Sequence, residues 1–247
     1  MCGKERPPEA RACPTPRLMA LWDGFGVQET AALLRDPVFR GRGIPRGDGR
    51  PVLVVPGFLS GDWSFIPMHG WLKRLGYNAH FSGINFNVLT SEHLVAGLRP
   101  RLETLFKGTE RRVTLIGHSR GGLLSKVLAQ RHPEQVEQVI MLGSPVSDQR
   151  DIAALTGAAV RVAIAANELG TGRRQVESGR FTYDLKATPV VPTVSIYTVT
   201  DGVVNFRSCL RPDIPAIQVW GSHNGLVVNP EVYRAVGRLL ARPKRAP

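Results

Sequence analysis

The chain has 247 residues, a length that suits one domain with a sizeable core and leaves little room for two. Apolar residues make up 43% of the chain, which indicates a globular protein. The net charge of +12 comes mostly from scattered arginines, without the zinc-finger spacing, helix-turn-helix pattern or aromatic motif of sequence-specific nucleic-acid binding. We therefore expect no specific nucleic-acid partner and at most a weak attraction to anionic membrane surfaces.

The three cysteines, Cys2, Cys13 and Cys209, are an odd number and show no metal-ligand spacing. We expect neither a disulfide framework nor a bound metal ion. The first residues lack the pattern of a secretory signal, and no apolar run approaches the length of about 18 residues that predicts a membrane span. The default expectation is a cytoplasmic protein.

Predicted elements alternate between strands and helices along most of the chain. Residues 1–17 carry prolines among charges and predict a disordered tail. Strands are predicted at 52–55, 79–84, 112–116, 137–142, 193–199 and 216–220, and helices at 26–36, 64–75, 92–107, 120–131 and 230–241. This order predicts an α/β fold with a mostly parallel sheet of about six strands and helices on both faces. We expect one domain over 18–241, followed by a basic tail over 242–247.

One interval is too long for a single crossover helix. About 50 residues separate the strand at 137–142 from the next predicted strand. We assign about 148–190 to a cap or lid over the site, with a packing excursion as the alternative. The apolar residues expected to contact a substrate there are Leu155, Leu169, Phe181 and Tyr183.

Gly117-His118-Ser119-Arg120-Gly121 stands where a predicted buried strand gives way to a helix. A G-x-S-x-G sequence in that context predicts a nucleophile elbow, a sharp turn that exposes the serine hydroxyl at the top of the sheet. The turn is strained and leaves no room for a Cβ at either glycine. We predict Ser119 as a nucleophile and His118 as a packing residue beside it.

A serine hydroxyl needs a base and an orienting acid before it can attack a substrate. Two further predicted strands end in such groups, at the sheet edge where the sites of open α/β sheets gather. Asp201 follows the strand before last, and His223 follows the last strand. We predict His223 as the base and Asp201 as the acid, with Asp213 and Asp184 as alternative carboxylates.

Pro56-Gly57-Phe58 follows directly after the first predicted strand. Gly57 allows a tight turn that aims the backbone N–H of Phe58 at the nucleophile, and the N–H of Arg120, after the serine, supplies a second donor. Losing one such donor reduces the rate by about 10²–10³. We predict Phe58 and Arg120 as the oxyanion hole.

From about residue 50 to residue 241 the chain resembles the α/β-hydrolase superfamily, in its lipase- and esterase-like branch. The resemblance is carried by the Pro-Gly-Phe turn, by Gly-His-Ser-Arg-Gly-Gly, by Thr-Asp-Gly-Val-Val at 200–204 and by Gly-Ser-His-Asn-Gly-Leu-Val-Val-Asn-Pro at 221–230. It implies a serine hydrolase that cleaves carboxylic esters, with a small-molecule or lipid ester as its substrate and with neither a metal nor an organic cofactor. Many lipases carry His in place of Pro56 and Met or Gln in place of Arg120, and these departures concern specificity rather than mechanism.

Two other functions would use the same residues. An acyltransferase or a thioesterase has the same triad and differs in its acceptor or acyl donor. A ligand-binding protein with the same fold would need no catalysis at all. The presence of nucleophile, base, acid and oxyanion turn together favours the hydrolase, because a pure binding protein has no need of all four.

Overall fold

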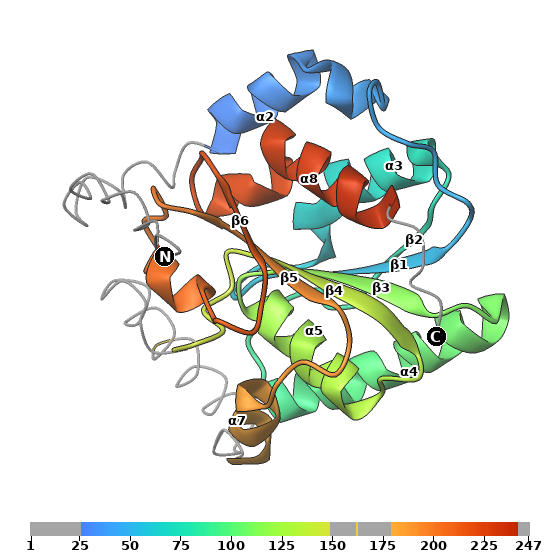
Figure 1. The fold of residues 1–247 in the computed structure, drawn as a ribbon, viewed down its shortest axis with the longest axis vertical. Coiled ribbons are helices and arrows are strands. Elements are labelled where there is room, and N and C mark those ends of the chain that lie inside the picture. The colour runs from blue at the N-terminus through green and yellow to red at the C-terminus, as the bar shows by residue number, and fades with distance from the viewer. Residues whose placement is uncertain (1–25, 149–161, 163–178, 242–247) are drawn as a thin grey trace, which may run out of the picture.

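The computed structural model describes residues 26–148, residue 162 and residues 179–241. These residues form three layers, with one sheet between two layers of helices (Figure 1). The predicted tails over 1–17 and 242–247 and most of the predicted cap lie outside the described residues.

The sheet has six strands, all parallel to their neighbours, in the order β2-β1-β3-β4-β5-β6. Their bounds are β1 Pro51–Val55, β2 Asn78–Phe81, β3 Val113–His118, β4 Val136–Leu142, β5 Thr193–Thr198 and β6 Ala216–Val219. Every residue of β1 and β3 is buried, as expected for central strands of a parallel sheet covered on both faces. The predicted fold class is confirmed.

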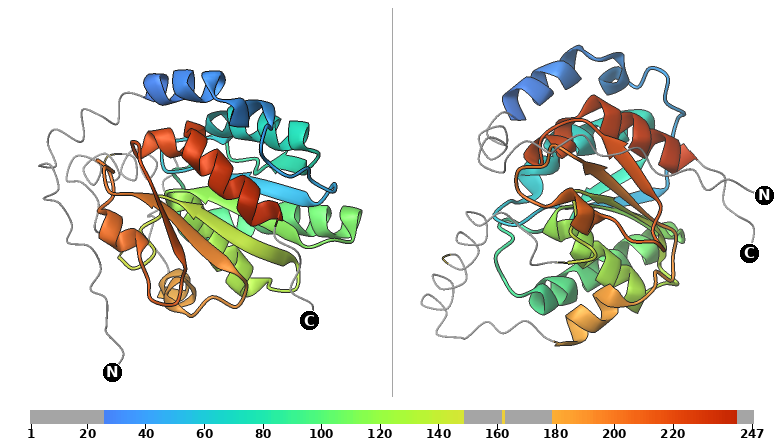
Figure 2. Two further views of the ribbon diagram at one scale, coloured as in Figure 1. Left: turned by 45° about the horizontal axis from the view of Figure 1, so that its top comes forward. Right: turned by 60° about the vertical axis from the view of Figure 1, so that its left-hand side comes forward.

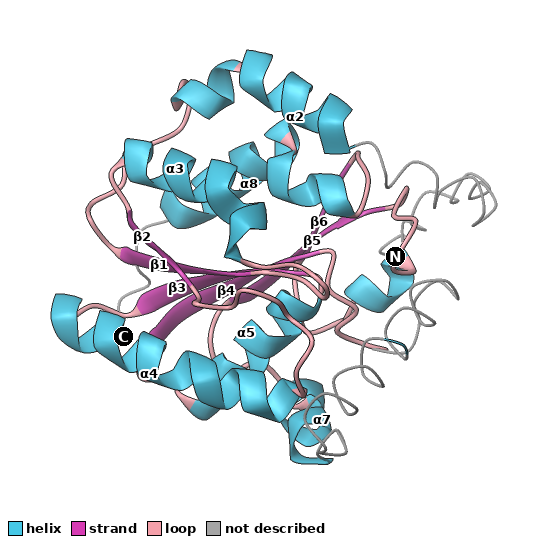
Figure 3. Cartoon of the chain, turned by 180° about the vertical axis from the view of Figure 1, so that it is seen from behind, coloured by secondary structure: helices cyan, strands magenta, loops and turns pink. Residues whose placement is uncertain are grey.

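Helices lie on both faces of the sheet (Figures 1 and 3). On one face lie α2 (Gly26–Arg35), α3 (Ile66–Leu75) and α8 (Pro230–Ala241), and on the other lie α4 (Ser91–Thr109), α5 (Arg120–Arg131) and α7 (Gly179–Lys186). Figure 2 shows α2 on the outside of α3 and α8, furthest from the sheet. None of these helices combines the length and the apolar character that crossing a bilayer requires.

Two apolar cores result, one on each face of the sheet. On the face of α2, α3 and α8 the ring of Trp71 packs against that of Tyr233, with ring centroids 4.7 Å apart, and Leu33 of α2 is fully buried beside them. On the other face, leucines of α4 and α5 such as Leu98 and Leu124 fill the space against the sheet. Residues of α3 and α8 pack in one core and residues of α4 and α5 in the other, so both cores fix the helices next to the candidate site.

Along the chain, β2 is added on one side of β1, whereas β3 and the later strands are added on the other side. The topological switch point of the sheet therefore lies between β1 and β3. The chain leaving β1 continues into α3 on one face, whereas the chain leaving β3 continues into α5 on the other. Loops that diverge in this way leave a crevice at the carboxyl ends of the strands, where open α/β sheets bind their ligands. Phe58 follows β1 and Ser119 follows β3, so both predicted site segments lie at this switch point.

Two strands end earlier than predicted, because side-chain carboxylates accept the backbone N–H groups that follow them. The strand predicted to reach residue 84 ends at Phe81, because the Asp62 carboxylate accepts the N–H groups of Ser82 and Gly83, at 3.1 and 2.7 Å. The last strand ends one residue early, because the N–H of Trp220 donates to a carboxylate of α8. Sequence patterns do not show such long-range partners.

Candidate active site

Ser119 has a strained backbone at the junction of β3 and α5. Its φ of 52° and ψ of −123° lie outside the usual regions for a residue with a side chain. The N–H of Ser119 donates to the carbonyl of Leu142 on β4 at 2.7 Å, and its carbonyl accepts the N–H of Gly122 at 3.1 Å. These two bonds hold the turn in the geometry of a nucleophile elbow.

The glycines around the serine are required by close backbone contacts. A Cβ on Gly117 would collide with the backbone of Gly121, and a Cβ on Gly121 would collide with the carbonyl of Val55. A Cβ on Gly122 would collide with the hydroxyl of Ser144, which is fully buried against α5. The elbow therefore packs directly on β1 and on the turn after β4.

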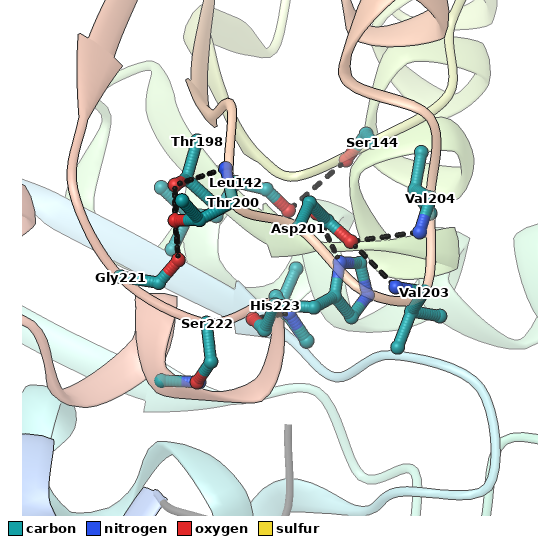
Figure 4. Close-up of polar contacts among 12 residues, drawn as sticks. Leu142, Ser144, Thr198, Thr200, Asp201, Val203, Val204, Gly221, Ser222 and His223 are labelled. Atoms are coloured by element: carbon teal, nitrogen blue, oxygen red, sulfur yellow. Dashed lines mark hydrogen bonds and ion pairs between the residues drawn. The ribbon is translucent and has the colours of Figure 1, made fainter. Parts of the chain in front are cut away.

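His223 and Asp201 form a buried pair beneath the loops that follow β6 and β5 (Figure 4). Nδ1 of His223 lies 2.6 Å from Oδ2 of Asp201, and the two side chains are 4% and 1% exposed. The other carboxylate oxygen accepts the N–H groups of Val203 and Val204, at 2.9 and 2.7 Å. This arrangement places the proton of a neutral imidazole on Nδ1 of His223, so Nε2 is the nitrogen that carries no proton.

The two alternative carboxylates are engaged elsewhere. Asp213 accepts two hydrogen bonds from Arg211, at 2.9 and 2.6 Å, and this guanidinium lowers the pKa of the carboxyl. Asp184 lies on α7 and pairs with Arg131 at 2.6 Å. Of the three carboxylates considered from the sequence, Asp201 is the one that contacts His223.

His118 does more than pack beside the serine. Its Nε2 lies 2.9 Å from the carbonyl oxygen of His223, and the two rings are 4.8 Å apart between centroids. Burial, and secondly the nearby charge of His223, lower the pKa of His118 to about 3. The ring is therefore neutral near pH 7, and its Nε2–H donates to the backbone of the predicted base.

The predicted oxyanion turn lies close to Ser119. A Cβ on Gly57 would be 3.2 Å from the Cβ of Ser119, and both residues line the same cavity as Phe58. The buried Asn87 holds this turn through three bonds: its Nδ2 donates to Pro56 O at 2.8 Å, its N–H donates to Ser60 O at 2.8 Å, and its carbonyl accepts the N–H of Leu59 at 3.2 Å.

The side chain of Arg120 also joins this framework. Its guanidinium donates to Asn87 Oδ1 at 3.1 Å, to Leu89 O at 2.7 Å and to Ser91 Oγ at 3.0 Å, and it lies 5.8 Å from the ring centroid of Phe58. The segment before α4 is thus tied to the residue after Ser119. The sequence carries no local signal for these contacts of Asn87 and Arg120.

A cavity of about 590 Å³ opens beside Ser119 and His223. Its apolar lining side chains are Phe58, Leu59, Trp63, Val203, Val227 and Val228. Gly26 and Thr30 of α2 complete the wall. The arrangement offers a pocket with many apolar side chains, lined also by a serine and by a histidine paired with a carboxylate.

The cap prediction is wrong for the two aromatic residues that the structure describes. Phe181 is 1% exposed and packs in the core against α5, whereas Tyr183 is 76% exposed, and neither lines the cavity. The physical reason is the apolar side of α7, which packs on α5 and is held there by Lys126, whose Nζ donates to two carbonyls at the end of α7. Leu155 and Leu169 lie outside the described residues.

Comparisons with known proteins find one family model and a set of solved structures that resemble this chain. A family model described as a PGAP1-like alpha/beta domain matches residues 77–162. No curated protein matches the chain in sequence.

Solved structures resemble the chain over most of its length. The mature form of lipase BlEst2 from Bacillus licheniformis has a TM-score of 0.57 at 18% identity, over 80% of this chain and 94% of that one. A monoacylglycerol lipase from Paleococcus ferrophilus has a TM-score of 0.53 at 14% identity, over 78% and 95%. The thioesterase domain from the curacin biosynthetic pathway has a TM-score of 0.52 at 14% identity, over 79% and 92%. At these identities the likeness shows the fold.

Proposed function

We propose that this chain, which has the α/β-hydrolase fold, is a serine hydrolase that cleaves carboxylic esters. One observation carries the proposal: the strained Ser119 and the Asp201-paired His223 line the same apolar cavity at the switch point of the sheet. A strained backbone at a serine, beside a buried histidine–carboxylate pair, is the arrangement that activates a hydroxyl for attack.

The reaction proceeds through an acyl-enzyme. The hydroxyl oxygen of Ser119 attacks the ester carbonyl carbon while Nε2 of His223 takes the hydroxyl proton, and Asp201 stabilises the imidazolium that forms. The N–H groups of Phe58 and Arg120 stabilise the tetrahedral oxyanion. His223 then gives its proton to the leaving alcohol, and a water molecule, deprotonated by the same nitrogen, releases the acid and restores Ser119.

The lining of the cavity supports an ester with an apolar group. Five of the apolar side chains that line the cavity are Phe58, Leu59, Trp63, Val227 and Val228. Each CH₂ group that leaves water for such a pocket contributes about 0.8 kcal/mol. We therefore expect kcat/KM to rise from acetate to butyrate and hexanoate esters.

An acyltransferase or a thioesterase is the second candidate, favoured by the thioesterase domain among the similar structures. The same residues would act in the same order, and the difference would lie in the acceptor or the leaving group. A non-catalytic binding protein is less favoured, because strain at Ser119 lowers stability and is retained where a site needs it.

The test compares wild-type protein with Ser119→Ala on p-nitrophenyl acetate, butyrate, hexanoate and palmitate, on the matching acyl thioesters, and with an added alcohol as acceptor. Ester hydrolysis by the wild type, reduced by about 10³-fold or more in the variant, supports the proposal. Faster thioester cleavage, or acyl transfer to the alcohol in place of hydrolysis, would favour the second candidate. Turnover that is unaffected by the substitution, or no turnover at all, contradicts the proposal.

A further inference from the structure

Glu29 of α2 reaches the loop that carries His223. One of its carboxylate oxygens accepts the backbone N–H of Ser222 at 2.7 Å, and the other accepts the hydroxyl of Ser222 at 2.5 Å. Ser222 directly precedes His223 in the chain, whereas Glu29 lies 193 residues earlier. Ser222, the residue before the proposed base, is therefore held by two hydrogen bonds to α2.

The loop is shaped to receive this carboxylate. A Cβ on Gly225 would overlap the carboxylate of Glu29, and a Cβ on Gly221 would lie 2.5 Å from one of its oxygens. The N–H of Gly225 also donates to the hydroxyl of Ser222, at 3.0 Å. Glycines on both sides of His223 thus leave space for Glu29, and the Ser222 hydroxyl links Glu29 to the far side of the loop.

The backbone of His223 is held on its other side by His118. The Nε2–H of His118 donates to the carbonyl oxygen of His223, so the loop is bonded before the base by Glu29 and at the base itself by His118. The imidazole of His223 is oriented by Asp201. The hydrogen bonds of Glu29, His118 and Asp201 together set the position of Nε2 of His223.

The helix that carries Glu29 is itself firmly placed. Leu33 of α2 is fully buried, and Asp36, directly after α2, pairs with Arg234 of α8 at 2.7 Å. Gly26 and Thr30, on either side of Glu29 in sequence, line the cavity, whereas Glu29 is absent from its lining. Glu29 can therefore act on the loop without touching a substrate in the cavity.

We propose that Glu29 is a positioning residue of the proposed hydrolase, which sets the place of His223 relative to Ser119 through its two bonds to Ser222. The inference rests on the proposed function. A displacement of about 1 Å in a catalytic group can cost about 10² in rate. Because Glu29 lies outside the cavity, its loss is expected to lower kcat and to leave KM nearly unchanged.

The test uses the full chain with Glu29→Ala, Glu29→Gln and Ser222→Ala. We expect Glu29→Ala to lower kcat by about tenfold or more with KM changed by about twofold at most. Glu29→Gln keeps an oxygen for the N–H of Ser222 and is expected to retain more activity. The rate at which a fluorophosphonate labels Ser119 is expected to fall with kcat, because both steps need His223 as a base.

Glu231→Ala is the matched control for Glu29→Ala. Its carboxylate accepts the backbone N–H of Trp220 at 3.1 Å, on the same loop but at an exposed position before the glycine. We expect this variant to keep the kcat and the labelling rate of the wild type. An equal loss in Glu231→Ala would show that any loosening of the loop suffices, and would overturn a specific role for Glu29.

A measurement without substrate separates this inference from the proposed function. The proton between Nδ1 of His223 and Oδ2 of Asp201, which are 2.6 Å apart, is expected to give a strongly downfield NMR resonance. We expect this resonance to shift or broaden in Glu29→Ala and to be unchanged in Glu231→Ala. If the wild type hydrolyses esters and Glu29→Ala keeps both kcat and this resonance, the inference is wrong and the proposed function stands. If the wild type neither turns over esters nor is labelled, but the resonance moves in Glu29→Ala, the function is wrong and Glu29 still positions His223. Should Glu29→Ala fail to fold, Glu29→Gln and Ser222→Ala decide the same comparison.

Discussion

His118 hydrogen-bonds to the backbone carbonyl of His223 at 2.9 Å, so the residue before the proposed nucleophile is directly bonded to the proposed base. The bond joins the elbow after β3 to the loop after β6, two segments that are 105 residues apart. The two proposed catalytic groups therefore belong to segments that are hydrogen-bonded to each other.

The burial of His118 makes folding stability depend on pH. The pKa of His118 falls from 6.5 to about 3 on folding, chiefly because of burial. Between these two values the unfolded chain binds more protons at this residue than the folded protein, so stability rises with pH and is lost as the pH falls from about 6.5. We expect His118 to contribute about 2 kcal/mol of destabilisation between pH 7 and pH 5.

The measurement is urea unfolding of the wild type and of His118→Gln at pH 7 and pH 5. Glutamine keeps an N–H donor for the carbonyl of His223 but does not titrate. The variant is expected to lose less stability on acidification than the wild type, by about 2 kcal/mol. Identical pH dependence in the two proteins would contradict a neutral, buried His118.

Asp201→Asn is expected to keep the fold and lower kcat by up to about 10⁴, because an amide favours the wrong tautomer of His223. Asp213→Asn is the control, since Asp213 pairs with Arg211 and makes no contact with His223 in the structure. Steady-state kinetics on an activated ester distinguish the two. A larger loss in Asp213→Asn would reassign the acid.

Trp63→Ala is expected to reduce the preference for longer acyl groups. Trp63 lines the cavity and is 62% exposed. Loss of about 1 kcal/mol of apolar contact corresponds to about a fivefold decrease in kcat/KM for hexanoate esters, with little change on acetate esters. Tyr183→Ala, on the outer side of α7, is expected to leave the profile unchanged. The opposite pattern would place the acyl group under the cap.

Asn87→Ala is expected to weaken the oxyanion turn. The substitution leaves the carbonyl of Pro56 without its donor and removes one acceptor of the Arg120 guanidinium. An unsatisfied buried group costs about 1–3 kcal/mol of stability, and loss of one oriented oxyanion donor lowers the rate by about 10²–10³ at most. Kinetics and thermal unfolding measure the two effects. Asn78→Ala, at the edge strand β2, is the control, and equal kinetic losses in both variants would exclude a role for Asn87 at the turn.

Much of the site was predictable from local pattern. The elbow around Ser119 needs a buried strand, a glycine-flanked serine and a helix within a few residues, so its signal is contained in one short segment. Asp201 and His223 could be placed because parallel strands bring their carboxyl ends to one edge of a sheet. The assignments of these residues as catalytic groups stay predictions.

Short-range pattern alone determined the six strands, the helices on both faces and the loops from which the site residues come, because each depends on the side-chain period of a few consecutive residues. Tertiary structure decided which side chains meet. Asn87, Glu29 and Arg120 hold the site through contacts to loops distant in the chain, and the apolar side of α7 turned to α5 rather than to the cavity. These outcomes depend on how whole helices pack and on which buried polar groups form hydrogen bonds with one another. Both depend on residues far apart in the chain, so no single segment of the sequence predicts them.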